Sequence, residues 1–181
     1  MTIPNIISIF RMLLIPFVIA FLFIDVNYNY QIALGLYLFA MITDLIDGYI
    51  ARKYKLESEL GRFLDPLADK MMNILLMITL LYLQIFPIWI VLLQIARDLF
   101  VDAVINLQAS LKMFTSAVIG AKLRTLLLTA SIAVGIIALS NSQPGFINAA
   151  YYLLIISFAA GFIGIFKPTI SIGKKILTKW K

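Results

Sequence analysis

The stretch that decides the fold is Asp44–Lys70, DLIDGYIARKYKLESELGRFLDPLADK. It holds six of the nine acidic residues in a chain of 181 residues that is 62% hydrophobic. Apolar sequence runs into it over residues 32–42 and away from it over residues 71–83. Carboxylates therefore stand at the ends of two hydrophobic helices, where charge is costly unless it is paired or bound to a metal ion.

The spacing of four aspartates favours a divalent metal site. Asp44 and Asp47 are three residues apart, and Asp65 and Asp69 are four apart, so each pair shares one face of a helix. The two like-charged pairs repel each other unless a cation lies between them. Oxygen ligands in a chain without His or Cys favour Mg²⁺ or Mn²⁺ over zinc. The alternative is that these acids only pair with neighbouring Arg and Lys side chains in a solvated loop.

Local patterns predict how this stretch is built. Gly48 and Ala51 follow on the face of the first aspartate pair, where small side chains let a ligand or a backbone approach closely. Pro66 suits the first turn of a helix, with Asp65 as its N-cap. Glu59 is expected in the loop before that helix.

The composition predicts an all-α integral membrane protein. A soluble helical bundle would need polar outer faces, which most of these helices lack. Without His and Cys, acid–base chemistry falls to carboxylates, Lys, Tyr or water. The net charge of +6 lies mostly at expected membrane edges, which favours lipid headgroups over nucleic acid as the partner.

Hydrophobic runs predict six transmembrane helices in a single domain covering residues 1–181. They lie at about 12–24, 31–50, 66–83, 88–107, 122–139 and 146–166. The first span is expected to begin upstream of residue 12, after a turn at Pro4-Asn5.

The loops predict the orientation of the chain. The connections between spans one and two, three and four, and five and six contain no Lys or Arg. The N-terminal segment, the other two connections and the C-terminal tail hold nearly every basic residue. Positive charge stays on the cytoplasmic side, so we expect a multi-pass protein of the inner or plasma membrane. Both termini and the carboxylates then face the cytoplasm.

Three cations near this side predict a site for a phosphate group. Arg97 lies inside the fourth span, and Lys122 and Arg124 open the fifth. Together they would form a basic pocket beside the carboxylates. The alternatives are that Arg97 forms a structural ion pair with Asp98 or Asp102, and that the other two cations only anchor the helix at the interface.

The aspartate stretch resembles the signature of the CDP-alcohol phosphotransferase family, D-x2-D-G-x2-A-R-x8-G-x3-D-x3-D. Every specified position is present between Asp44 and Asp69, including Gly48, Ala51-Arg52 and Gly61. The six-span expectation is similar to the fold of that family, so the resemblance covers nearly the whole chain.

The resemblance implies transfer of a phosphatidyl group from a CDP-linked lipid to an alcohol, with release of CMP and with two Mg²⁺ or Mn²⁺ ions. By the motif, the metal ligands are Asp44, Asp47, Asp65 and Asp69, and Asp69 is also the catalytic base. The residues implied for the cytidine diphosphate pocket are Gly48, Ala51, Arg52 and Gly61. Family members commonly form homodimers, so a homodimer is expected.

Within the family the chain is most similar to the phosphatidylglycerophosphate synthases. Ala121-Lys122-Leu-Arg124-Thr125 resembles their G-K-x-K-T stretch, and Arg97, Lys122 and Arg124 would hold the phosphate of the acceptor. The expected substrates are therefore CDP-diacylglycerol and sn-glycerol 3-phosphate.

Four other functions stay open. Ala96-Arg97-Asp98 is more similar to the cardiolipin synthases of the same family, whose acceptor is phosphatidylglycerol. An inositol phosphate acceptor is the second alternative. A divalent-cation transporter and a non-catalytic membrane anchor are the others, although a transporter site is expected at mid-membrane and not at the ends of spans.

Overall fold

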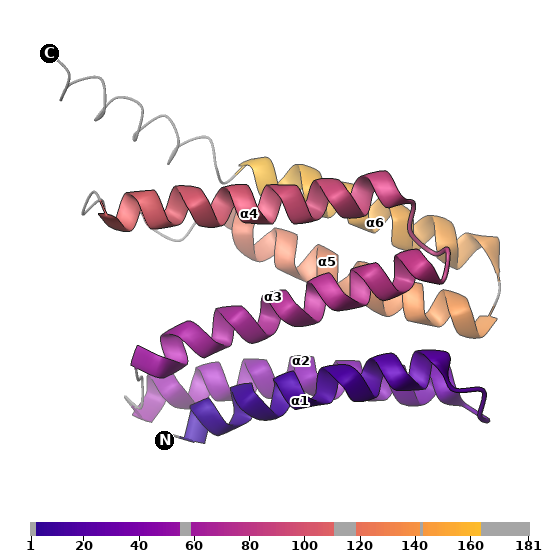
Figure 1. The fold of residues 1–181 in the computed structure, drawn as a ribbon, viewed down its shortest axis with the longest axis horizontal. Coiled ribbons are helices and arrows are strands. Elements are labelled where there is room, and N and C mark those ends of the chain that lie inside the picture. The colour runs from indigo at the N-terminus through magenta and orange to yellow at the C-terminus, as the bar shows by residue number, and fades with distance from the viewer. Residues whose placement is uncertain (1–2, 55–58, 111–118, 142, 164–181) are drawn as a thin grey trace, which may run out of the picture.

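The structure is a computed structural model that describes residues 3–54, 59–110, 119–141 and 143–163. This part of the chain is all-helical. Its helices are α1 (Ile3–Phe23), α2 (Asn29–Tyr54), α3 (Glu59–Tyr82), α4 (Ile88–Ser110), α5 (Ile119–Asn141) and α6 (Pro144–Ile163). Successive helices run in opposite directions, so the starts of α1, α3 and α5 and the ends of α2, α4 and α6 lie toward one end of the bundle (Figure 1). We call this the charged end, because the end of α2 and the start of α3, which carry the stretch Asp44–Lys70, lie there.

The first helix begins earlier than expected. The predicted turn at Pro4-Asn5 is wrong, because α1 already begins at Ile3. Proline is favoured in the first turn of a helix, where its missing N–H has no intrahelical partner to lose. Asn5 is buried at 2% exposure, so this segment packs into the protein.

The third helix also begins upstream of its predicted start. Pro66 lies inside α3, which begins at Glu59, so the predictions of Asp65 as an N-cap and Glu59 as a loop residue are both wrong. The segment before the proline contains Glu, Leu and Arg, which favour helix strongly enough to extend it upstream. One consequence is that Asp65 and Asp69 project from the interior of a helix and not from its first turn.

The helices form two close pairs, which meet directly where α2 contacts α5 and are bridged by α3 and α4. α1 lies along α2, and α5 lies along α6, while α3 contacts α1, α4 and α5 (Figure 1). The shared core includes Val18, Tyr37, Leu80 and Ile132, all fully buried. Gly135 of α5 lies in this core, where an added Cβ atom would meet Leu80 Cδ1 at 3.0 Å.

Many large apolar side chains point outward. Three helices in the described part of the chain are long and apolar enough to cross a membrane, over Asn5–Phe23, Lys122–Asn141 and Pro144–Phe162. Along the outside of α1, Leu13 and Phe17 are 59% and 58% exposed. Exposed apolar surface on this scale is typical of a membrane protein, whose outer faces contact lipid.

Candidate functional site

A buried arginine links the two halves of the aspartate motif. Arg11 of α1 forms ion pairs with Asp44 of α2 and with Asp69 of α3. The Arg11 side chain is fully buried, whereas the side chains of Asp44 and Asp69 are 32% and 36% exposed. The two carboxylates therefore face each other across a cation and remain open to the outside on their other sides.

The third described aspartate is held by the same helix. Ser8 lies one turn before Arg11 on α1, and its hydroxyl donates a hydrogen bond to Asp65 Oδ1. Residues three apart share a face of a helix, so one face of α1 contacts three of the four motif aspartates. These contacts of Arg11 and Ser8 were not predicted from the sequence. A single early charge three residues after Ser8 was the only signal of them in the sequence.

The carboxylates of the described residues do not form a complete metal site. Among the described residues, no group of three or more acidic side chains is close enough to hold a metal ion. The backbone of Asp47 continues α2, but its side chain lies outside the described part of the structure. The hard-oxygen donor set suits Mg²⁺ or Mn²⁺, and the Arg11 guanidinium shows that a positive charge fits between Asp44 and Asp69.

Most of the predicted nucleotide pocket falls where side chains are not described. Gly48, Ala51 and Arg52 lie on the last turns of α2, after Asp44. The structure describes only their backbone. Gly61 is buried in the first turn of α3. The motif thus brings the end of α2 and the start of α3 to the charged end of the bundle (Figure 1).

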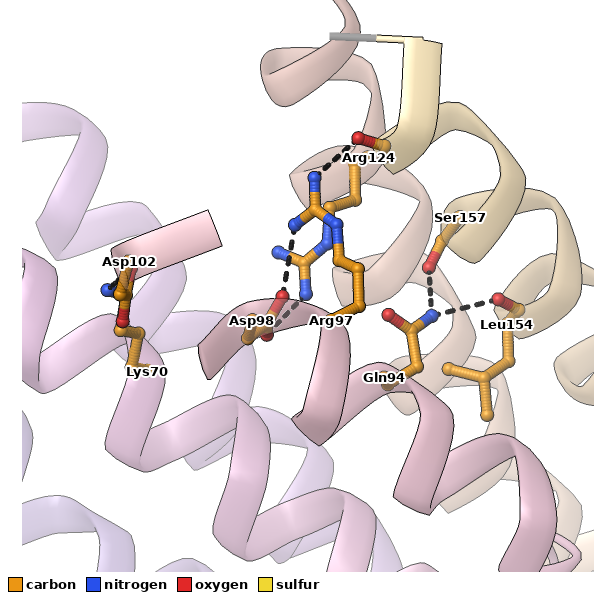
Figure 2. Close-up of polar contacts among 9 residues, drawn as sticks. Lys70, Gln94, Arg97, Asp98, Asp102, Arg124, Leu154 and Ser157 are labelled. Carbon is orange, nitrogen blue, oxygen red and sulfur yellow. Dashed lines mark hydrogen bonds and ion pairs between the residues drawn. The ribbon is translucent and has the colours of Figure 1, made fainter. Parts of the chain in front are cut away.

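A second polar cluster joins α4, α5 and α6. Asp98 accepts a hydrogen bond from Arg97 Nη1 at 3.0 Å and one from Arg124 Nη2 at 2.5 Å (Figure 2). All three side chains are buried, at 7%, 10% and 11% exposure for Arg97, Asp98 and Arg124. Two guanidinium groups share one carboxylate, so the cluster carries a net positive charge. We call these three residues the arginine cluster.

The arginine cluster retains unused hydrogen-bond donors. Arg97 Nη2 donates to the Gly161 carbonyl oxygen at 2.6 Å. The Nε atoms of Arg97 and Arg124 are buried and have no partner among the described residues. Buried donors without a partner are costly, and an anion is the ligand that would satisfy them.

A neighbouring polar contact holds α4 against α6. Gln94, one turn before the arginine cluster, donates from Nε2 to Ser157 Oγ at 2.7 Å and to the Leu154 carbonyl at 3.0 Å (Figure 2). All of these groups are buried. The contact sets the position of α4 along the axis of α6, and therefore also the position of Arg97.

The third predicted cation lies outside the arginine cluster. Lys122 is exposed at the start of α5, and among the described residues Asp98 pairs with Arg97 and Arg124. Asp102, one turn after Asp98, pairs with Lys70 of α3, the residue that follows Asp69 (Figure 2). The predicted structural ion pair of Arg97 is therefore made with Asp98, while Asp102 connects α4 to the aspartate motif.

Comparison with known proteins places these features in a family. The family model described as CDP-alcohol phosphatidyltransferase matches residues 1–163. A protein of Rickettsia typhi named CDP-diacylglycerol–glycerol-3-phosphate 3-phosphatidyltransferase is 33% identical over 162 residues, which are 90% of each chain. A Pseudomonas fluorescens protein of the same name is 37% identical over 114 residues, 61% of this chain and 58% of that protein.

Cardiolipin synthases are also similar. The human cardiolipin synthase (CMP-forming) is 41% identical over 105 residues, which are 58% of this chain but 34% of the relative. The chain thus spans about a third of that relative's length and little more than half of the Pseudomonas protein's. The match to the family model covers most of the chain, and the motif aspartates gather at one end of an all-helical bundle. The chain belongs to the CDP-alcohol phosphatidyltransferase family.

Proposed function

We propose that this protein transfers the phosphatidyl group of CDP-diacylglycerol to sn-glycerol 3-phosphate, forming phosphatidylglycerol phosphate and CMP in phospholipid biosynthesis. The observation that carries the proposal is the similarity to the Rickettsia typhi enzyme of that name, which extends over 90% of both chains. The ion pairs of Arg11 with Asp44 and Asp69, and the arginine cluster, supply an acidic and a basic site and support it further.

The proposed topology has six transmembrane helices, with both termini and the charged end on the cytoplasmic side of the inner or plasma membrane. The alternation of basic and non-basic connections supports this orientation. Water-soluble substrates would then reach the carboxylates from the cytoplasm, while the acyl chains of the donor stay in the membrane.

The four motif aspartates, Asp44, Asp47, Asp65 and Asp69, would hold two divalent ions, Mg²⁺ or Mn²⁺. Members of this family use divalent metal ions. Bound ions would offset the charge of the pyrophosphate and of the transition state. The position of Arg11 supports the proposal, because its single charge offsets only one of the two carboxylates Asp44 and Asp69 and leaves a net negative charge for a bound cation.

The nucleotide pocket would be lined by Gly48, Ala51, Arg52 and Gly61. Small residues on α2 and at the start of α3 allow a diphosphate to approach the helix backbones closely. Arg52 carries the charge needed to bind a phosphate oxygen.

The acceptor would bind at the arginine cluster. Arg97 and Arg124 together outweigh the single charge of Asp98 and keep buried donors without partners, which suits an acceptor that carries its own phosphate. Lys122 would attract the acceptor from an exposed position at the start of α5.

The reaction follows from this placement. The acceptor hydroxyl oxygen forms a bond to the phosphorus that carries the diacylglycerol, the bond from that phosphorus to the bridging oxygen breaks, and CMP leaves. Asp69 takes the hydroxyl proton as general base, which removes the need for a histidine. Its partly exposed side chain is consistent with contact to a bound acceptor.

Assembly as a homodimer stays a prediction from the resemblance. The broad exposed apolar surface of the helices is compatible with a second copy or with lipid.

The test is an acceptor assay on the purified chain with CDP-diacylglycerol and Mg²⁺ or Mn²⁺. Labelled sn-glycerol 3-phosphate, phosphatidylglycerol and inositol phosphate are offered in parallel, and CMP release is measured. We expect product from sn-glycerol 3-phosphate alone and a loss of roughly 10²–10⁴-fold in the Asp69→Asn variant. Asp25→Asn is the matched control, since Asp25 lies in the loop between α1 and α2 at the other end of the bundle.

Cardiolipin synthesis is the second candidate function. The 41% identity to the human cardiolipin synthase and the Ala96-Arg97-Asp98 sequence favour it. Product from phosphatidylglycerol alone would keep the proposed chemistry and replace the acceptor. Absence of CMP release with every acceptor would refute both functions.

A further inference from the structure

The close contact between Arg97 and Gly161 depends on the absence of a side chain on α6. The two residues lie 64 positions apart in the chain, yet Arg97 Nη2 donates to the Gly161 carbonyl oxygen at 2.6 Å. A Cβ atom added at Gly161 would lie 2.8 Å from both Cζ and Nε of Arg97 and 2.9 Å from Nη2. No carbon atom fits at those distances, so any other residue at position 161 forces the guanidinium away.

The guanidinium is the part that would move. It stands at the end of a flexible side chain, whereas Gly161 is fixed in the backbone of α6 and α4 is held beside it by the contacts of Gln94. A substitution at Gly161 therefore displaces Arg97 within the arginine cluster at small cost to the helix packing. Displacement also strains the shared carboxylate, because Asp98 pairs with Arg97 and Arg124 together.

We propose that Gly161 is a positioning residue that sets the Arg97 guanidinium for binding the phosphate of the acceptor. The proposal rests on the acceptor site described under the proposed function and deepens it. Gly161 touches no substrate; it acts by leaving room for the planar guanidinium against α6. A glycine near the end of an apolar helix thereby becomes a determinant of acceptor affinity.

The chain offers a matched control. A Cβ atom added at Gly145, in the first turn of the same helix, would meet no atom within 4 Å. Gly161→Ala and Gly145→Ala therefore make the same chemical change on α6, and only the first one contacts Arg97. Both exchanges are compared on the full-length chain in detergent.

The first readout separates the acceptor from the donor. We expect Gly161→Ala to raise the KM for sn-glycerol 3-phosphate by roughly tenfold, the effect of weakening one charged hydrogen bond. The KM for CDP-diacylglycerol and kcat stay near the wild-type values, because ground-state binding of one substrate is changed. Gly145→Ala leaves all three constants unchanged.

The second readout does not depend on activity. Binding of inorganic phosphate, measured by titration calorimetry, is expected to weaken by roughly tenfold in Gly161→Ala and to stay unchanged in Gly145→Ala. In an Arg97→Lys background, which lacks the planar guanidinium, adding Gly161→Ala should change phosphate affinity no further. This double-mutant cycle isolates the contact between the two residues.

Three results would overturn the proposal: phosphate affinity unchanged by Gly161→Ala, an equal loss in the Arg97→Lys background, or no phosphate binding by the wild-type chain. Failure of the proposed function looks different. A wild-type chain that releases CMP only with another acceptor, or with no acceptor tested, would refute the proposed function. Its affinity for inorganic phosphate would still fall in Gly161→Ala if Gly161 positions Arg97.

Discussion

Replacing Asp98 with asparagine tests whether the arginine cluster is a buried charge system. The change removes the one carboxylate that Arg97 contacts at 3.0 Å and Arg124 at 2.5 Å, in a place where all three side chains are at most 11% exposed. Two guanidinium groups are left without their shared counter-charge. Removing one partner of a buried ion pair costs about 3–5 kcal/mol.

The assay is thermal unfolding of the purified chain in detergent. At roughly 2–4 °C per kcal/mol for a chain of this size, we expect the Tm of Asp98→Asn to fall by about 6–20 °C. Added inorganic phosphate should recover part of the loss, because the anion supplies the missing negative charge to the two arginines.

Asp102→Asn is the matched control, since it makes the same change one turn further along α4. Asp102 pairs with Lys70, and the two side chains are 34% and 42% exposed. Such an exposed pair contributes at most about 1 kcal/mol. Equal Tm losses in the two variants, or a smaller loss in Asp98→Asn, would refute the assignment of the arginine cluster as a buried, mutually dependent set.

Two further predictions concern the aspartate motif and the core. Arg11→Gln removes the buried cation between two partly exposed motif carboxylates, so in the presence of a chelator the free energy of unfolding should drop by about 1.5–3 kcal/mol, the contribution of hydrogen bonds to charged groups. Saturating Mg²⁺ should stabilise this variant more than the wild type, and an equal Mg²⁺ effect in both would contradict the reasoning. Gly135→Ala adds a methyl group 3.0 Å from Leu80 Cδ1 and should cost about 1–3 kcal/mol by overpacking, measured by thermal unfolding against Gly35→Ala, whose added carbon meets nothing within 4 Å.

Fold class and family could be predicted from the sequence because they depend on local patterns. Long apolar runs predict helices wherever they occur, and the structure confirms an all-helical chain in its described part. The spacing of the motif carries the family assignment, which the family match confirms. The contacts of Asp44, Asp65 and Asp69 with one face of α1 did not follow from the sequence, because all three aspartates project from the interiors of α2 and α3.

Helix boundaries were less predictable. The prolines at positions 4 and 66 suggested a turn and a helix start, but neighbouring residues that favour helix extend α1 and α3 past them. A proline marks a helix boundary only when the residues beside it also disfavour helix.

What the sequence determined by itself was the kind of residue in this part of the bundle, namely carboxylates in the motif of α2 and α3 and arginines in α4 and α5. Only the tertiary structure decided the partners, because they come from helices far apart in the chain. Arg11 joins Asp69 across 58 residues, and Arg97 meets Gly161 across 64. Such contacts depend on the relative height and rotation of packed helices, which side-chain packing sets and no local pattern encodes.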